Sequence, residues 1–307
     1  MGDFLGKVVF LGGDDRMEVA ARCLRTRGWH TVEWGTSEKN TNECEWQEVV
    51  SCADVIILPL PASSDGVRIH MPKVADAALR FHSLLREVRK DCVILGGRIS
   101  PVWKQQAEAE NVRLEDYYSF ETLQMKNALP TAEGAICLAM NALPVTISGS
   151  HFSVIGYGRI ASLLAEKLHA LGAIVTVYAR KPRDLAHAEL RGLRTVCLPD
   201  VCTENTVLSF DPACRMVFNT VPVRVLKEPT LQSLPNACIL MELASLPGGF
   251  DPLIADKLGI NWILASALPG KCFPESAGRI LAEVFNERLQ ELWQNRGYAT
   301  ERNDRLC

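Results

Sequence analysis

The sequence lacks the features of membrane, disulfide-stabilised and nucleic-acid-binding proteins. Its apolar runs fall well short of the roughly 20 residues that a membrane-spanning helix needs. The 33 basic and 36 acidic residues nearly cancel, and a net charge of −3 argues against broad electrostatic binding to nucleic acid or anionic membranes. The 11 cysteines are odd in number and contain no CxxC pair, so they do not suggest a disulfide framework. We expect a reduced, soluble, cytoplasmic protein.

Signatures of metal-dependent and hydrolytic catalysis are also missing. The six histidines show no ligand spacing, and neither HxH nor HExxH occurs. No GxSxG elbow or cysteine-protease signature is present. The N-terminus, MGDFLGKVVFLGGDD, has no charged region before its apolar run, which favours a first strand over a signal peptide. We predict no metal site.

Short apolar runs alternate with helical patterns along the whole chain, which is typical of an α/β fold. The first part predicts strands at 7–12, 30–34, 54–60 and 92–97, helices at about 16–27, 73–88 and 101–110, and a short strand and loop at 111–123. The second part predicts strands at 152–155, 174–178, 194–198, 216–220, 239–243 and 262–264, and helices at 159–171 and about 184–191.

Two further helices suggest how the chain is divided. An apolar helix is predicted at 131–143, with Thr131 as its cap, and a long one at about 274–295. A chain of 307 residues favours two domains. We predict two Rossmann-like, doubly wound domains with a cleft between them, linked by two long helices. Residues 1–128, joined by the final helix at about 280–300, form the substrate domain; 129–144 form the linking helix and 145–279 the dinucleotide-binding domain.

The pattern Gly156-x-Gly158-x-x-Ala161 lies between a predicted strand and a predicted helix, which makes it a dinucleotide fingerprint. Gly156 permits the tight turn, Gly158 lets a pyrophosphate approach backbone N–H groups, and Ala161 allows close helix–strand packing. A glycine-rich turn without a ligand is the alternative. The residues assigned to this part of the cofactor site are Gly156, Tyr157, Gly158, Arg159 and Ile160.

The second strand of this unit ends in basic residues. NAD sites usually carry Asp or Glu there to bind the ribose 2′-OH, whereas this chain has Arg180 and Lys181. Both can pair with a 2′-phosphate, so NADP(H) is favoured over NAD(H), with a solvated basic turn as the alternative. The GGDDR turn at 12–16 carries acidic residues where a phosphate would sit, and we interpret it as a packing turn or as part of the substrate side.

Ligands of doubly wound sheets bind at the carboxyl ends of the strands. The segments at these ends are rich in glycine and hydroxyl groups, which suits a small anionic substrate. Glu133 is either a charge near the helix start or an acid/base, with Thr131 beside it. The cofactor site is completed by Asn219, Thr220, Val221, Pro222, Ala244 and Ser245, and the candidates for substrate binding are Ser63, Ser64, Arg98, Gly248, Gly270 and Lys271.

The predicted architecture is similar to that of NAD(P)-dependent D-2-hydroxyacid dehydrogenases. Their chemistry uses a His shortly before the final helix, where this chain has Pro269-Gly270-Lys271-Cys272. Because reducing a ketone needs a proton donor, the missing His makes a hydroxyacid dehydrogenase a poor candidate.

An ordered series of segments resembles one family more specifically, the A subunit of dipicolinate synthase from spore-forming bacteria. The series is GGDDR (12–16), IILPLPASSDG (56–66), NALPTAEGAI (127–136), VIGYGRIA (154–161), VFNTVP (217–222), LASLPGG (243–249) and ALPG…PESAGRI (267–280). Leu246 departs from a basic residue expected there, and Arg98 stands in a loop that tends to be smaller and neutral.

The resemblance implies an NADP-dependent oxidation that forms dipicolinate (pyridine-2,6-dicarboxylate) from a dihydrodipicolinate-level precursor of the lysine pathway. It also implies a partner, the flavoprotein-like B subunit of the synthase, and action in the mother-cell cytoplasm during sporulation. We expect a homo-oligomer. The alternatives are another NADP-dependent dehydrogenase of a small carboxylic acid, and a non-catalytic NADP-binding regulatory subunit.

Overall fold

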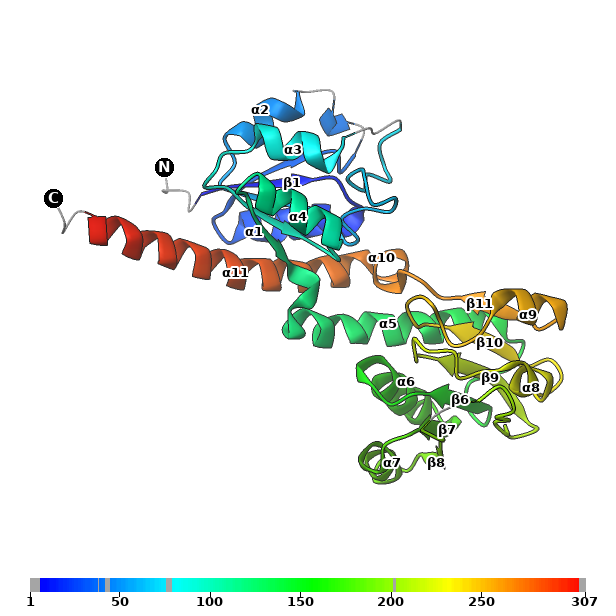
Figure 1. Cartoon of the computed structure of the whole chain (residues 1–307). Helices are drawn as coiled ribbons and strands as arrows, with labels where there is room; N and C mark the ends of the chain where they lie inside the picture. The colour runs from blue at the N-terminus through cyan, green and yellow to red at the C-terminus, as the bar shows by residue number, and fades with distance from the viewer. Residues whose placement is uncertain (1–5, 38, 42–44, 76–78, 201–202, 304–307) are drawn as a thin grey trace. The chain divides into compact units, whose positions relative to one another are not determined.

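The computed structural model describes residues 6–37, 39–41, 45–75, 79–200 and 203–303. The chain divides into two compact units, one formed by Met1–Asn127 with Phe273–Cys307 and the other by Ala128–Cys272. Figure 1 shows both units and labels most of their helices. Each unit is built around its own parallel sheet.

The first unit contains a five-stranded sheet in the order β2-β1-β3-β4-β5. All of its strand pairs run parallel. Chain order reverses between β1 and β3, which makes that position the switch point of the sheet. The strands are β1 (Lys7–Leu11), β2 (His30–Trp34), β3 (Val55–Ile57), β4 (Val93–Gly96) and β5 (Arg113–Asp116).

Helices cover both faces of the first sheet, as Figure 1 shows. Apolar side chains of α2 (Trp46–Ser51), α3 (Phe81–Glu87) and α4 (Pro101–Ala109) pack on one face. The other face is covered by α1 (Asp15–Thr26) and α11 (Pro274–Asn303). Two short 3-10 helices complete the unit, η1 (Lys39–Thr41) and η2 (Tyr117–Ser119).

The final helix belongs to the first unit because its apolar face completes that core. Phe285 is fully buried, with ring centroids 6.1 Å from Phe10 and 4.9 Å from Tyr117. Gly278 permits the close approach of α11 to α1, since a Cβ there would lie 2.5 Å from the Val19 Cβ. Arg288 adds a two-pronged ion pair to Glu115 of β5, with N–O distances of 2.7 and 2.8 Å.

The second unit contains a six-stranded sheet in the order β11-β10-β9-β6-β7-β8. Relabelled from its own first strand, this is the 3-2-1-4-5-6 order of the Rossmann fold, and its switch point lies between β6 and β9. Its strands are β6 (His151–Ile155), β7 (Ile174–Ala179), β8 (Arg194–Cys197), β9 (Cys214–Asn219), β10 (Ile239–Glu242) and β11 (Trp262–Leu264).

The helices of the second unit also pack on both sheet faces. Buried residues of α5 (Glu121–Ala142) and α6 (Arg159–Ala170) share one core with α7 (Pro182–Glu189). On the other face lie α8 (Glu228–Gln232) and α9 (Pro252–Lys257). The short α10 (Leu268–Cys272) contacts α5 closely, because a Cβ on Gly134 would lie 2.9 Å from the Leu268 Cβ. Among the described residues, no helix is both long and apolar enough to cross a membrane.

The α/β class and the two parallel sheets confirm the predicted fold class, and all the predicted strands are present within a few residues of their expected ends. Several helices differ. The helix predicted at 131–143 begins ten residues earlier, at Glu121, so Thr131 is not its cap and Pro130 lies inside it. The helix predicted at 73–88 begins only at Phe81, and residues 76–78 lie outside the described residues. Four short helices, α2, α8, α9 and α10, were not predicted.

Replacing Phe285 by Ala removes a ring that contacts both β1 and the segment after β5. We expect the free energy of unfolding of the first unit to fall by about 3–5 kcal/mol. Urea unfolding followed by tryptophan fluorescence measures the loss. The exposed Gln290 of the same helix is the control, and an equal effect of Q290A would contradict this packing.

Candidate functional site

The turn after β6 lies at the switch point of the second sheet, and its geometry requires glycine at Gly156. Gly156 has φ of 98°, a conformation that L side chains rarely adopt. A Cβ there would lie 2.5 Å from the Thr220 Oγ1, which donates a hydrogen bond to the Ile155 carbonyl at 2.8 Å. The ends of β6 and β9 are therefore joined directly across the switch point.

Gly158, by contrast, faces open space. A Cβ built on it would have no atom within 4 Å, and no side chain caps the N-terminus of α6, which begins one residue later. Ala161 is fully buried where the helix meets the sheet. The first-turn N–H groups, which no side chain caps, and the space beside Gly158 fit a phosphate approaching the backbone.

A cavity of about 750 Å³ opens at this edge of the second sheet, a size typical of ligand pockets. Many of the predicted cofactor residues line it, namely Gly156, Tyr157, Gly158, Arg180, Lys181, Thr220, Val221 and Pro222. Tyr157 adds a buried Oη that has no hydrogen-bond partner among the described residues. The remaining predicted cofactor residues, Arg159, Ile160, Asn219, Ala244 and Ser245, do not line this cavity.

Two cations that were not predicted from the sequence, Arg224 and Lys227, line the cavity together with the predicted Arg180 and Lys181. Arg224 pairs with Asp251 at 2.6 Å, and Lys227 pairs with Glu204 at 2.6 Å. The Arg180 Nη1 lies 3.4 Å from the Asp200 carbonyl oxygen, a long contact that leaves most of the guanidinium without a partner among the described residues. Four basic side chains and two acidic ones, Asp184 and Asp200, therefore line the cavity, and this net positive lining suits an anionic ligand.

Glu242, at the end of β10, is a buried carboxylate that holds two site loops in place. Its oxygens accept hydrogen bonds from the Asn219 Nδ2 at 2.7 Å, the Ala244 N–H at 2.9 Å and the Gly249 N–H at 2.8 Å. Asn219, fully buried, continues the network to the backbone of Val221. Burial raises the pKa of Glu242 above its usual value, although the three donors act in the opposite direction.

Glu242 was not predicted as a site residue. The one available signal was an acidic residue at the end of an otherwise apolar strand, just before LASLPGG. Asn219 is fully buried and bonded within the protein, so the structure places its side chain in the support of the loops.

Ser63, Ser64, Arg98 and Gly248 lie in loops that follow strands, whereas Gly270 and Lys271 lie on the short helix α10. Ser63 is engaged within its own loop, donating to the Arg68 carbonyl at 2.6 Å and accepting from the Gly66 N–H. Arg98 is exposed, with its guanidinium 5.8 Å from the centre of the Tyr118 ring. Ser64 is exposed in the first unit, whereas Gly248, Gly270 and Lys271 belong to the second.

The two predicted catalytic residues lie on α5 and do not line the cavity. Glu133 forms an ion pair with Lys167 of α6 at 2.8 Å, so its carboxylate has a partner within the second unit. Thr131 lies on the same helix, two residues earlier, and also has a partner. Among the described residues, no three His, Cys, Asp or Glu side chains are grouped so that they could hold a metal ion.

The two parallel sheets and the glycine turn at a switch point define an α/β protein whose fold resembles that of dehydrogenases. The solved D-lactate dehydrogenase from Escherichia coli has a similar fold, with a TM-score of 0.55 at 11% identity over 91% of this chain and 95% of that one. At this identity the likeness concerns the fold alone, which is that of NAD(P)-binding dehydrogenases.

Closer relatives give the family. The model of the N-terminal domain of the dipicolinate synthase A subunit matches residues 7–118. The chain is 30% identical to the A subunit of dipicolinate synthase from Bacillus subtilis over 95% of this chain and 98% of that protein. The crystal structure of the A subunit from Bacillus halodurans superposes with a TM-score of 0.81 at 28% identity, covering 93% of this chain and 98% of that one. The chain belongs to the family of dipicolinate synthase A subunits, and the resemblance found in the sequence is confirmed.

Replacing Glu242 by Ala removes the acceptor of the buried Gly249 N–H, of the part-buried Ala244 N–H and of one of the two bonds donated by the Asn219 amide. We expect the second unit to lose about 2–3 kcal/mol of unfolding free energy, with faster hydrogen exchange at the Ala244 and Gly249 amides. Glu204 is a matched control, since it is 82% exposed and ion-paired, and its replacement by Ala should cost less than about 1 kcal/mol. Unchanged exchange at both amides in E242A would contradict the supporting role.

Proposed function

We propose that the chain is an NADP-dependent oxidoreductase that forms dipicolinate from a dihydrodipicolinate-level precursor, in the mother-cell cytoplasm of a sporulating bacterium. One observation carries the proposal: an open glycine turn and basic residues share a single cavity in a member of the dipicolinate synthase family. We take the product from the name of the family, and we infer the class of cofactor from the residues that line the cavity.

The residues of the second unit fit a dinucleotide phosphate. The Gly156–Gly158 turn and the start of α6 would hold the pyrophosphate through backbone N–H groups. Arg180 and Lys181, at the end of β7, would pair with the 2′-phosphate, which NAD lacks. When bound, NADP⁺ would accept the hydride that the dihydropyridine ring loses as it becomes aromatic.

The chain's own residues would hold the two carboxylates and take up one proton. We assign Ser63, Ser64, Arg98, Gly248, Gly270 and Lys271 to the carboxylates. Glu133, with Thr131 beside it, or a water molecule would accept the proton. Glu133 is paired with Lys167, so its role as the proton acceptor needs a direct test. Full turnover by E133Q with normal NADP⁺ binding would exclude this role.

The Glu133–Lys167 ion pair also favours a second candidate, a subunit that binds NADP but performs no chemistry alone. The relatives are named as one subunit of a synthase, which implies a partner, and we propose that this partner is the flavoprotein-like B subunit. The two candidates differ in whether turnover occurs without that partner.

The experiment that tests the function follows NADPH and dipicolinate absorbance together. The mixture contains the full chain, NADP⁺ and the precursor made in place by the preceding enzyme, with and without the partner subunit. We expect both absorbances to grow in step. G158V is the inactive control, because its side chain enters open space in the folded protein and would block the pyrophosphate. If NADP⁺ binds but neither the NADPH nor the dipicolinate absorbance rises, with or without the partner, the proposed reaction is excluded.

Replacing both Arg180 and Lys181 by Ala tests the cofactor subtype. We expect the dissociation constant for NADP⁺ to rise about 10–100-fold, because charged hydrogen bonds to the 2′-phosphate are lost, and that for NAD⁺ to stay nearly unchanged. Isothermal titration measures both. R183A is the matched control, since Arg183 is exposed nearby but does not line the cavity. An equal loss for both cofactors would argue against 2′-phosphate recognition.

A further inference from the structure

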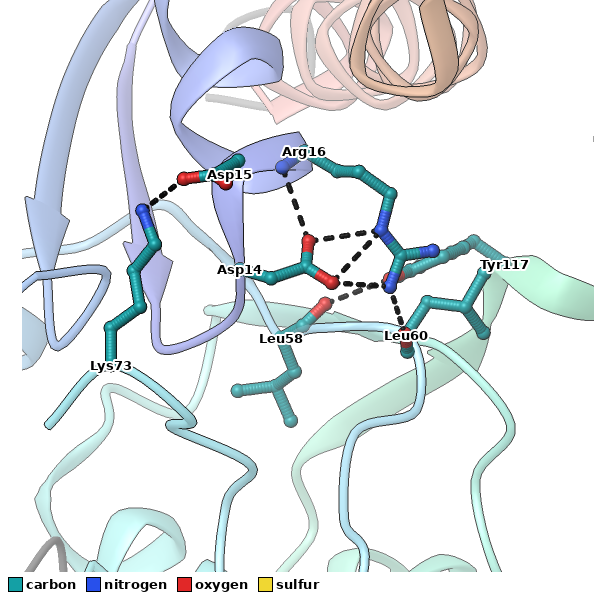
Figure 2. Close-up of polar contacts among 7 residues, drawn as sticks. All are labelled: Asp14, Asp15, Arg16, Leu58, Leu60, Lys73 and Tyr117. Atoms are coloured by element: carbon teal, nitrogen blue, oxygen red, sulfur yellow. Dashed lines mark hydrogen bonds and ion pairs between the residues drawn. The ribbon is translucent and has the colours of Figure 1, made fainter. Parts of the chain in front are cut away.

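The switch point of the first sheet carries a buried arginine that the proposed function has not used. β1 ends at Leu11 and β3 at Ile57, and the segments that follow them meet above the edge of the sheet. Arg16, in the first turn of α1, joins these two segments. Its side chain donates to Asp14 after β1 and to the Leu60 carbonyl after β3, as Figure 2 shows. Switch points are where doubly wound sheets bind their ligands.

This switch point differs from the open turn of the second sheet. Asp14 caps α1 by accepting from the Arg16 N–H at 3.1 Å, so a carboxylate of the chain occupies the place of a phosphate. The glycines are packed, since a Cβ on Gly12 would lie 2.9 Å from the His70 carbonyl oxygen and one on Gly13 would lie 2.3 Å from the Met17 Cγ. The backbone is closed to a dinucleotide, and any ligand must be recognised by side chains.

The Arg16 guanidinium is held along one edge. Its Nε donates to both Asp14 oxygens at 2.9 and 3.1 Å, and its Nη2 donates to Asp14 at 2.8 Å and to the Leu60 carbonyl at 2.6 Å. The fully buried Tyr117 fixes the same segment by donating to the Leu58 carbonyl at 3.0 Å. With only 7% of the residue exposed, the orientation of the guanidinium is fixed before any ligand arrives.

One nitrogen of the guanidinium, Nη1, remains available to a ligand. Nη1 forms no hydrogen bond with any residue that the structure describes, and no dashed line reaches it in Figure 2. Among the residues that the structure describes, the Tyr157 Oη is the only fully buried side-chain atom without a hydrogen-bond partner, so Nη1 is not fully buried. A role confined to holding the turn would leave these two N–H groups unused.

We propose that Arg16 binds a carboxylate of the substrate through Nη1, with Asp14 as the residue that positions it. This inference rests on the proposed function and adds a binding residue to it. A guanidinium with donors still available is the side chain best suited to a carboxylate. Nearby acidic groups are already engaged, because Lys73 pairs with both Asp15 and Glu18.

The test uses two stable probes, dipicolinate with two carboxylates and picolinate with one. Their binding to the full chain, with NADP⁺ present, is measured by isothermal titration for the wild type and R16K. We expect R16K to weaken dipicolinate binding about 10–100-fold and picolinate binding much less, while the NADP⁺ affinity stays unchanged. R22K is the matched control, since Arg22 lies on the same helix, is exposed and pairs with Glu275.

Other binding results would contradict either the role of Arg16 or the proposed function. An unchanged ratio of the two affinities in R16K, with or without a lower melting temperature, would mean that Arg16 only holds the turn. If R16K does not fold, D14N is the second variant, because it keeps the guanidinium but removes the charge that orients it. We expect D14N to lower the ratio of dipicolinate affinity to picolinate affinity, and an unchanged ratio would overturn the inference. A wild type that binds NADP⁺ but not dipicolinate would overturn the proposed function together with this inference.

Discussion

The parallel direction of the strands is the constraint on which both units depend. Because every strand pair of the two sheets runs parallel, the carboxyl ends of each sheet gather at one edge. Buried apolar strands bring the segments after β6 and β9 together in one unit, and those after β1 and β3 in the other. The chain places its glycines, its buried carboxylate and its buried guanidinium at these edges, so the chemistry follows from the topology.

The two switch points differ in what lies next to the N–H groups at the start of the helix that follows. At the second sheet the turn leaves its N–H groups and the space beside Gly158 open, and the partial charges of the backbone are available to an anion. At the first sheet Asp14 satisfies the helix N-terminus, and Arg16 neutralises Asp14. Backbone recognition suits the phosphates of a dinucleotide, whereas a rigidly held guanidinium nitrogen suits a carboxylate oxygen.

The strands could be predicted because their signal is local. β2 and β11 have the predicted ends, since each is a short run rich in β-branched and aromatic residues that follows a glycine turn. The predicted start of α5 at residue 131 was wrong. Pro130 followed by Thr131 resembles the start of a helix, while the first ten residues of α5 show no strong helical pattern. Helices of five or six residues such as α8 and α9 are too short to show a periodicity.

The site could be predicted where backbone geometry decides it and not where distant partners do. The requirement for glycine at Gly156 and the basic residues after β7 can be inferred from a single β-α-β unit. Glu242 and Arg16 act through partners on other strands and loops, such as Asn219 and the Leu60 carbonyl, which no spacing in the sequence reveals. Burying the charge of Glu242 or Arg16 costs free energy unless hydrogen-bond partners are held in place around it. The burial of these two groups therefore indicates that the loops around them are held rigidly. That rigidity is what a binding edge needs, because a donor fixed before the ligand arrives loses no further conformational entropy on binding.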